Sequence, residues 1–375
     1  MNKKILIAMD SFKGTFSSYE INNLVKKELE EKYDSIDVDC INIADGGEGS
    51  VDALIGAING EIKHVKVMGP YKDIIDSYYG IGVLNGRRIA IIEVASVVGF
   101  QYKKSDNDPG KVYTNGIGEL IKEAIKDKAK DIYICLGGSI SNDAGSGIVA
   151  SLGVKFFDKD YKELLPTGKT LKDIKHIDVG DVKDILDSVN LYCLCDVTNS
   201  LFGPKGASYV FAKQKGAKEE ELEELDSNLR YYHSLCVKEL GIKDDEAKTE
   251  GTGAAGGICY SLHVLIGAKI LSGIKTILKL NSIEEKIEKS DIVITGEGKL
   301  DSQSFDGKVI SEIGSLSKKY NKKLIGIFGL SEIKEYPGMN IIPLFELSEK
   351  IHDKSYLINN TPKRVKEKLR DYNLL

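Results

Sequence analysis

The sequence lacks any uninterrupted apolar run long enough to cross a bilayer, so we expect no membrane partner. Its start leads directly into a strand-like run, without the apolar stretch and small-residue cleavage site of a signal peptide. Together these absences predict a cytoplasmic protein. The cysteines include no C-x-x-C pair, which argues for reduced core residues and against disulfides or a zinc site. They are Cys40, Cys135, Cys193, Cys195, Cys236 and Cys259.

Positive charge is not in excess. The chain has 52 Lys and Arg residues against 57 Asp and Glu residues, which gives a net charge of -5. Because affinity for nucleic acid rests on clustered positive charge, this balance excludes a general polyanion binder, and we expect no nucleic-acid partner. The acidic stretch at residues 218–226 is interpreted as a solvated helix face.

Two well-known phosphate-binding signatures are also absent. The chain has no G-x-x-x-x-G-K-[ST] motif and no protein-kinase catalytic loop, which excludes both of those mechanisms. Residues 251–256 fit G-x-G-x-x-G, but they follow a polar run and no acidic residue stands about twenty positions later, as a dinucleotide site requires. These glycines therefore allow either close helix packing or the approach of a ligand.

The length and the order of the expected elements predict two domains. A chain of 375 residues exceeds the size at which one core usually stops growing. An apolar run at residues 4–9 is typical of a strand covered on both faces, and Ser17 and Glu20 have the spacing of a capping box that begins a helix. Further apolar strands are expected at residues 324–328 and 341–345, and a closing helix at 361–369.

The region between residues 61 and 94 differs from the rest. It is typical of successive strands, with Asn85-Gly86 as a hairpin turn. We therefore predict an α/β fold in which a mixed α/β domain, residues 66–284, is inserted into a Rossmann-like parallel-sheet domain. The latter is discontinuous and consists of residues 1–65 and 285–375. The active site is expected in the cleft between the two domains.

Polar, glycine-rich turns follow several of the expected strands. In open α/β sheets the ligand crevice lies outside the carboxyl ends of the strands, so this topology would gather the turns around one site. The turns are residues 10–14, 45–49, 137–143, 196–199 and 295–302.

Each requirement of phosphoryl transfer has candidates in these turns. The reaction needs positioned phosphates, a divalent cation and local positive charge. The main-chain amides of Gly137, Gly138 and Ser139 could cradle an anion, although glycines after a strand could equally serve only to make a tight turn. Asp196 ends a strand of apolar residues and cysteines, where partial desolvation would raise its pKa toward that of a general base. Asp143 is either a helix N-cap or a site residue.

Taken together, six segments resemble the glycerate kinase family of bacterial glycerate and glyoxylate metabolism. They are AMDSFKGTFSS, IADGGEGSVDAL, LGGSISNDAGSGIVASLG, CDVTNSLFGPKGASYVFAKQKGA, GTGAAGG and DIVITGEGKLDSQSFDGKV, in the family's order from residue 8 to residue 309. The chain departs from the family pattern at Met9, where proline is common, and at Lys205 and Lys299, where arginine is common. Lysine offers a phosphate a point charge in place of a bidentate fork.

The resemblance implies ATP-dependent phosphorylation of D-glycerate to 2-phosphoglycerate with Mg²⁺. The alternatives are 3-phosphoglycerate as the product, another small hydroxy acid as the acceptor, or an anion- or nucleotide-binding sensor without catalysis. Asp196 is the expected base, while Lys13 and Lys299 are expected to offset negative charge. The candidate metal ligands are Asp45, Asp143 and Glu297. The remaining candidates for binding substrate or nucleotide, besides Lys13, are Asp10, Ser11, Gly46, Gly47, Gly137, Gly138, Ser139, Asn142, Thr198, Asn199, Gly296, Gly298 and Asp301.

Overall fold

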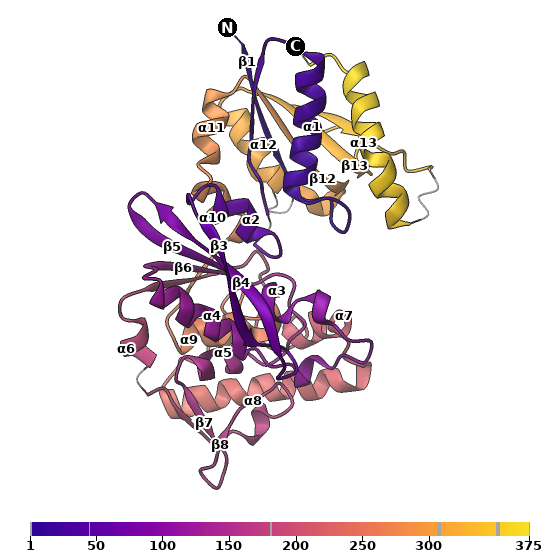
Figure 1. The fold of residues 1–375 in the computed structure, drawn as a ribbon. Coiled ribbons are helices and arrows are strands. Elements are labelled where there is room, and N and C mark those ends of the chain that lie inside the picture. The colour runs from indigo at the N-terminus through magenta and orange to yellow at the C-terminus, as the bar shows by residue number, and fades with distance from the viewer. Residues whose placement is uncertain (1, 45, 181, 306–308, 350–352, 375) are drawn as a thin grey trace. The chain divides into compact units, whose positions relative to one another are not determined.

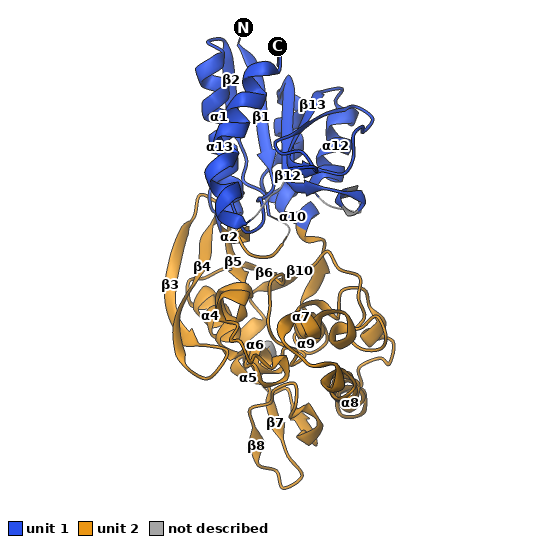
Figure 2. Ribbon diagram, turned by 90° about the vertical axis from the view of Figure 1, so that its right-hand side faces the viewer, with its two compact units in different colours: residues 1–45, 52–57, 274–375 blue, residues 46–51, 58–273 orange. Residues whose placement is uncertain are grey.

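The computed structural model describes residues 2–44, 46–180, 182–305, 309–349 and 353–374 (Figure 1). It contains two compact units, coloured separately in Figure 2. Unit 1 consists of Met1–Asp45, Asp52–Ala57 and Ile274–Leu375, and unit 2 of Gly46–Val51 and Ile58–Gly273. The domain boundaries at residues 65 and 285 stay a prediction from the sequence.

Unit 1 is built on a five-stranded parallel sheet with the order β14-β13-β12-β1-β2. Renumbered along the chain within the unit, this order is 2-1-3-4-5, that of a doubly wound sheet whose switch point lies between β1 and β12. The α/β, Rossmann-like fold expected for this part is confirmed. The strands are β1 (Lys3–Met9), β2 (Ile36–Cys40), β12 (Ile292–Leu300), β13 (Lys323–Ser331) and β14 (Met339–Pro343).

Helices cover both faces of this sheet, which explains why its strands are apolar throughout. In β1, Ile5 and Ile7 pack in one cluster with α1 (Ser18–Lys32) and α13 (Lys354–Asp371), which contact each other. Leu6 and Ala8 pack in a second cluster on the opposite face. That face is covered by α10 (Gly273–Leu280), α11 (Ile283–Lys289) and α12 (Val309–Lys319). The predicted capping box of Ser17 and Glu20 is present at the start of α1.

Unit 2 contains a six-stranded mixed sheet with the order β11-β10-β6-β5-β4-β3. The first four strands are parallel, and β4 and β3 join them as an antiparallel meander. The predicted hairpin is confirmed, because Asn85 (φ 51°) and Gly86 (φ 75°) both have the positive φ of a primed turn. The strands are β3 (Glu61–Met68), β4 (Ile74–Leu84), β5 (Arg87–Glu93), β6 (Asp131–Cys135), β10 (Asn190–Leu194) and β11 (Lys269–Leu271).

Smaller elements complete the fold. A separate antiparallel sheet consists of β7 (Lys155–Phe157), β8 (Glu163–Leu164) and β9 (His176–Asp178). The remaining α-helices are α2 (Ser50–Ile55), α3 (Ala95–Val98), α4 (Asn115–Lys126), α5 (Ser146–Ser151), α6 (Val182–Leu186), α7 (Lys213–Lys215), α8 (Leu222–Leu240) and α9 (Ala254–Val264). A π-helical turn spans Ser208–Ala212, and 3-10 turns span Phe100–Tyr102, Pro109–Lys111, Leu171–Asp173, Glu219–Glu221, Glu246–Lys248 and Ser302–Phe305.

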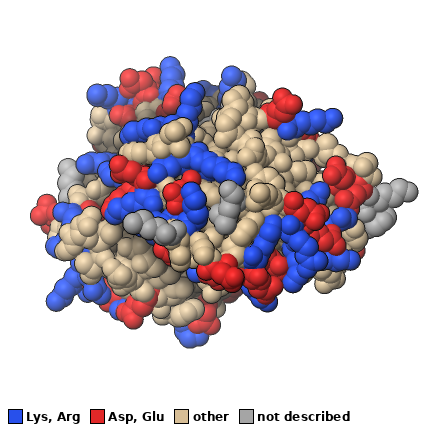
Figure 3. Space-filling model, turned by 90° about the horizontal axis from the view of Figure 1, so that it is seen from above, with Lys and Arg blue, Asp and Glu red and all other residues tan. Residues whose placement is uncertain are grey.

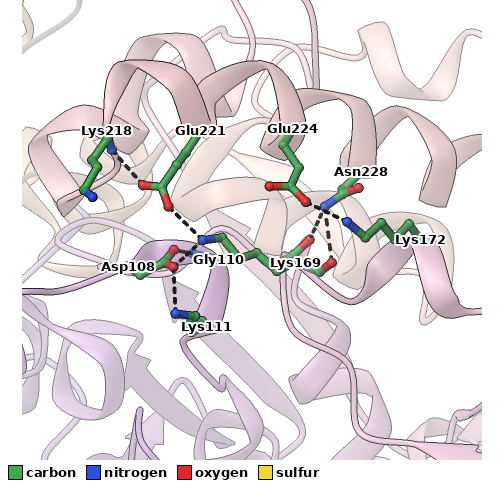
Figure 4. Close-up of polar contacts among 10 residues, drawn as sticks. Asp108, Gly110, Lys111, Lys169, Lys172, Lys218, Glu221, Glu224 and Asn228 are labelled. Atoms are coloured by element: carbon green, nitrogen blue, oxygen red, sulfur yellow. Dashed lines mark hydrogen bonds and ion pairs between the residues drawn. The ribbon is translucent and has the colours of Figure 1, made fainter.

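Acids in and just before the first turn of α8 are paired with lysines of the segment before β9 (Figure 4). Lys169 Nζ lies 2.7 Å from Glu221 Oε1, and it also contacts the Asp108 carboxylate. Lys172 Nζ lies 2.6 Å from Glu224 Oε1. The acidic stretch is therefore partly paired within unit 2 and is not wholly solvated. On the face drawn in Figure 3, basic and acidic side chains are intermingled.

Two further expectations concern cysteines and membranes. All six cysteines, which lie within the described part of the chain, are free thiols as predicted. Within that same part, no helix has both the length and the apolar character needed to cross a membrane.

The glycine-rich segment at residues 251–257 packs closely against other loops of unit 2. Gly256 has a φ of +72°, and a Cβ there would lie 2.1 Å from the carbonyl oxygen of Ser141. A Cβ on Gly253 would lie 2.2 Å from the carbonyl oxygen of Ser200. Of the two interpretations left by the sequence, close packing is the one that the structure supports.

This packing predicts unequal effects of two substitutions at glycines with similar φ. At Gly241 (φ +67°) an added Cβ would have no atom within 4 Å. Gly241→Ala should therefore lower the free energy of unfolding by only about 1 kcal/mol, the cost of a left-handed backbone for alanine. Gly256→Ala adds a clash with main chain, and should lose about 2–5 kcal/mol. Urea unfolding of both variants measures the difference, and equal losses would contradict the close packing.

Candidate functional site

A cavity of about 330 Å³ opens at the carboxyl ends of β1, β12 and β13 in unit 1, next to the switch point of the sheet. The loop after β1 contributes Asp10, Ser11, Phe12, Lys13 and Thr15, and β12 contributes Glu297, Gly298 and Lys299. These two segments are joined where Asp10 N donates a hydrogen bond to the carbonyl oxygen of Gly296 at 2.8 Å. The structure thus brings together six of the predicted site residues in one cavity.

Charged groups of both signs line this cavity. Asp10 is largely buried, and its Oδ1 accepts a hydrogen bond from Ser11 N at 2.7 Å. Lys13 is exposed at the loop. Lys299 Nζ lies 2.6 Å from Glu332 Oε1 and 3.8 Å from Asp301 Oδ2. The hydrogen bond to Glu332 raises the pKa of Lys299, so this lysine stays positively charged at neutral pH.

Gly296 itself shows why a glycine is needed at the end of β12. A Cβ at this position would lie 1.8 Å from the carbonyl oxygen of Ile327 in the neighbouring strand. Gly298 has more room, because its Cβ would meet Phe12 Cα at 3.4 Å, which is ordinary contact. The first glycine therefore has a structural role, while the second lines the cavity.

A second group of predicted residues gathers in unit 2. In the register of the sheet, Glu93, Cys135, Leu194 and Leu271 are neighbours, so the turns that follow β5, β6, β10 and β11 share one edge. The segment at residues 46–51 lies against this edge: Gly137 N donates to the carbonyl oxygen of Gly46 at 3.3 Å. A Cβ on Gly137 would lie 2.6 Å from Gly47 Cα, so these glycines permit the approach. Asp45, which precedes this segment, lies outside the described residues.

Asp196 lies at the same edge, directly after β10. Its Oδ1 accepts a hydrogen bond from Ser272 Oγ at 2.7 Å, which links it to the segment after β11. Because the side chain is exposed, the expectation that its apolar strand would partly desolvate it is wrong. The strand is buried only up to Leu194, and the turn beyond it faces solvent. Thr198 is also exposed, and Asn199 Nδ2 donates to the carbonyl oxygen of Lys205 at 2.8 Å.

Asp143 and Asn142 lie inside unit 2 and not on its surface. Asp143 is fully buried, and its carboxylate accepts hydrogen bonds from Thr114 Oγ1 at 2.6 Å, Gly145 N at 2.9 Å and Gly147 N at 3.4 Å. Burial raises the pKa of this carboxyl. The carboxylate thus orders the main chain at the start of α5, but the N-cap of that helix is Gly145 and not Asp143. Asn142 Nδ2 donates to Ser208 Oγ at 3.2 Å.

Sequence reasoning missed a buried lysine below the Gly137–Ser139 turn. Lys215 is 3% exposed, and its Nζ donates to Ser139 Oγ at 3.0 Å and to the carbonyl oxygen of Ser141 at 2.8 Å. Burial lowers the pKa of Lys215 to about 7, and the nearby Asp143 opposes this shift. No pattern distinguishes it from the other lysines of the AKQKGA segment, which is typical of a surface.

Two other polar residues at this edge were also missed. Glu93 is 1% exposed, and its Oε1 accepts a hydrogen bond from Val51 N at 2.7 Å. It ends β5, so the rule that strand ends carry site residues could have found it. Ser272 follows β11, a three-residue strand that gives no periodic signal.

The buried lysine predicts a pH-dependent stability. Between pH 7 and 10.5 the unfolded chain binds more protons at Lys215 than the folded chain does, so folded wild type gains stability as pH rises. From pH 7 to 9 it should gain about 2 kcal/mol relative to Lys215→Met, as measured by urea unfolding. Lys213→Met, an exposed lysine of the same helix, should show no such difference. Equal pH slopes for the two variants would contradict this.

Comparison with known proteins gives one consistent result. Residues 5–373 match the model of the glycerate kinase family. The chain is 38% identical over 327 residues to glycerate 2-kinase of Escherichia coli strain K12, covering 87% of this chain and 85% of that one. It is 37% identical, with the same coverage, to glycerate kinase of Bacillus subtilis strain 168. A crystal structure named for glycerate kinase 2 from Salmonella typhimurium LT2 superposes with a TM-score of 0.86 at 34% identity, covering 99% of this chain and 97% of that one. The chain belongs to the glycerate kinase family.

Proposed function

We propose that the protein transfers a phosphoryl group from ATP to the 2-hydroxyl of D-glycerate, with Mg²⁺, and releases 2-phosphoglycerate. The observation that carries the proposal is the match to the glycerate kinase family over residues 5–373. The similar Escherichia coli protein is named a glycerate 2-kinase. The geometry agrees with this, because an exposed acid, Asp196, and the glycine turn that begins at Gly137 lie at one edge of the sheet of unit 2.

The residues of unit 2 divide the chemistry between them. Asp196 is the base that accepts the proton of the attacking hydroxyl, and Ser272 Oγ positions its carboxylate by donating a hydrogen bond to Oδ1. The main-chain amides of Gly138 and Ser139 bind an anionic group, while the amide of Gly137 donates to Gly46. The buried Lys215 holds this turn in place through Ser139 Oγ. Gly46 and Gly47 lie next to the Gly137–Ser139 turn, and Thr198 and Asn199 follow Asp196 in the turn after β10. These residues are proposed to contact the substrate or the nucleotide.

The residues of unit 1 supply charge toward the phosphates. Lys13 and Lys299 line its cavity and offset negative charge, while Ser11 and Gly298 present main-chain groups. Asp301 lies near Lys299 and orients it.

The carboxylates of the cavity fit Mg²⁺. Magnesium in kinases is held by one or two carboxylates together with phosphate oxygens and water, and not by a full protein cage. Asp10 and Glu297 line the same cavity from neighbouring strands, and would hold the ion in this way. Asp143 does not fit, because its oxygens accept hydrogen bonds from within the fold. Among the described residues no group of three or more His, Cys, Asp or Glu side chains forms a ready metal site. Mg²⁺ would neutralise the charge that develops on the phosphates.

The reaction is tested by its product. With ATP, Mg²⁺ and D-glycerate we expect ADP release and 2-phosphoglycerate, identified by ³¹P NMR of the reaction mixture. Removal of Mg²⁺ with a chelator should abolish turnover. A signal of 3-phosphoglycerate would correct the position of attack, and turnover with other hydroxy acids but not glycerate would correct the acceptor. Binding without ADP release would favour a sensor.

The role of Asp196 is tested by Asp196→Asn, which keeps the shape but removes the base. Turnover should fall by a factor of about a hundred or more, with little change in the KM for ATP. Asp178→Asn is the control: Asp178 is an exposed aspartate that ends β9 of the separate small sheet and accepts a hydrogen bond from Gly180 N. Near-normal turnover of Asp196→Asn would assign the base elsewhere.

A further inference from the structure

The cavity of unit 1 also has an apolar wall, which neither glycerate nor phosphate would need. Besides the charged groups at the strand ends, Leu330, Phe345 and Leu357 line it with apolar side chains, together with Thr361. Leu330 of β13 is the register neighbour of Lys299. Phe345 follows β14, and Leu357 and Thr361 belong to α13. One cavity thus combines a charged side and an apolar side.

The apolar wall is rigid because it is part of the core of unit 1. Phe345 is 1% exposed and packs in the same cluster as Ile5 and Ile7 of β1. Its ring lies 6.2 Å from the ring of Tyr356, and the Arg364 guanidinium lies 5.6 Å from it. The wall is therefore preformed, as is usual for small-molecule sites.

Glycerate does not match this wall. A three-carbon acid that carries a carboxylate and two hydroxyls has almost no apolar surface to bury, so the wall would add nothing to its binding. A purine ring is flat and largely apolar on its faces, and in a nucleotide it is joined through a ribose to phosphates. A nucleotide therefore has the same two-sided chemistry as the cavity.

We propose that this cavity is the nucleoside subsite. The base lies against Leu330, Phe345 and Leu357, and the ribose and phosphates extend toward Asp10, Lys13 and Lys299. The location agrees with the topology, because in doubly wound sheets ligands bind at the switch point, here between β1 and β12. The inference rests on the proposed function for the identity of the nucleotide, and it adds which unit binds the base.

Leu357→Trp tests the subsite, because a larger side chain on α13 would fill the space of the base. With Mg²⁺ and no glycerate, isothermal titration should give an ADP Kd at least tenfold higher than that of wild type. Ile358→Trp is the matched control: Ile358 is the next residue of α13, is 39% exposed and does not line the cavity, so its ADP Kd should not change. The Kd of inorganic tripolyphosphate, obtained from its competition with ADP, should be the same in all three proteins, because the residues toward the phosphates are unchanged.

Urea unfolding of both variants checks that they fold. A second experiment uses wild type alone. Photolabelling with 8-azido-ADP, followed by peptide mass spectrometry, should modify residues of the 328–362 region. Labelling confined to unit 2, or an unchanged ADP Kd in folded Leu357→Trp, would overturn the inference while glycerate phosphorylation by wild type still stood. Absence of both ADP binding and turnover in wild type would instead reject the proposed function.

Discussion

The parallel pairing of β1 with β12 is the constraint on which unit 1 depends. It joins segments from the two ends of the chain in one register, Ile7 opposite Ile294 and Met9 opposite Gly296. Since parallel strands end at the same edge, this pairing alone brings Asp10 and Lys13 next to Glu297 and Lys299. Gly296 makes the register possible, because any side chain there would meet the main chain of β13. The order of the strands thus determines which segments meet in the cavity, and the side chains then determine its chemistry.

Unit 2 reaches a similar result by different means. Its parallel strands also end in one edge, but the turns there are brought into contact by glycines whose Cβ atoms would collide with neighbouring main chain. Two charged groups buried there are paired: Glu93 with Val51 N, and Lys215 with Ser139 and Ser141. Burying a lysine is costly, and it is tolerated here because its donors meet fixed acceptors and a carboxyl lies near it.

Local patterns in the sequence predicted local structure well. The Asn85-Gly86 hairpin, the capping box at Ser17 and the apolar strands are all set by nearest neighbours along the chain, and the structure contains each of them. The closing helix was expected only from residue 361; instead Asp353 caps α13, and Pro362 lies inside it. Of the site, strand-end turns pointed to six of the residues that line the unit 1 cavity, but not to its apolar residues such as Phe345 and Leu357. The exposure of Asp196 and the burial of Asp143 and Lys215 depend on loops distant in sequence, so no local pattern could give them.

The discontinuity of unit 1 has a consequence for how the chain becomes a protein on the ribosome. β1 and β2 are made first, yet the strand that pairs with β1 on its other side, β12, begins only at Ile292. Until then, the nascent β1 has an unpaired edge of apolar character, a feature prone to aberrant association. All six strands of the large sheet of unit 2 have been synthesised by Leu271, so unit 2 can fold before the last three strands of unit 1 exist. The order of synthesis thus makes the inserted unit the earlier one to mature, and unit 1 the step that completes the molecule.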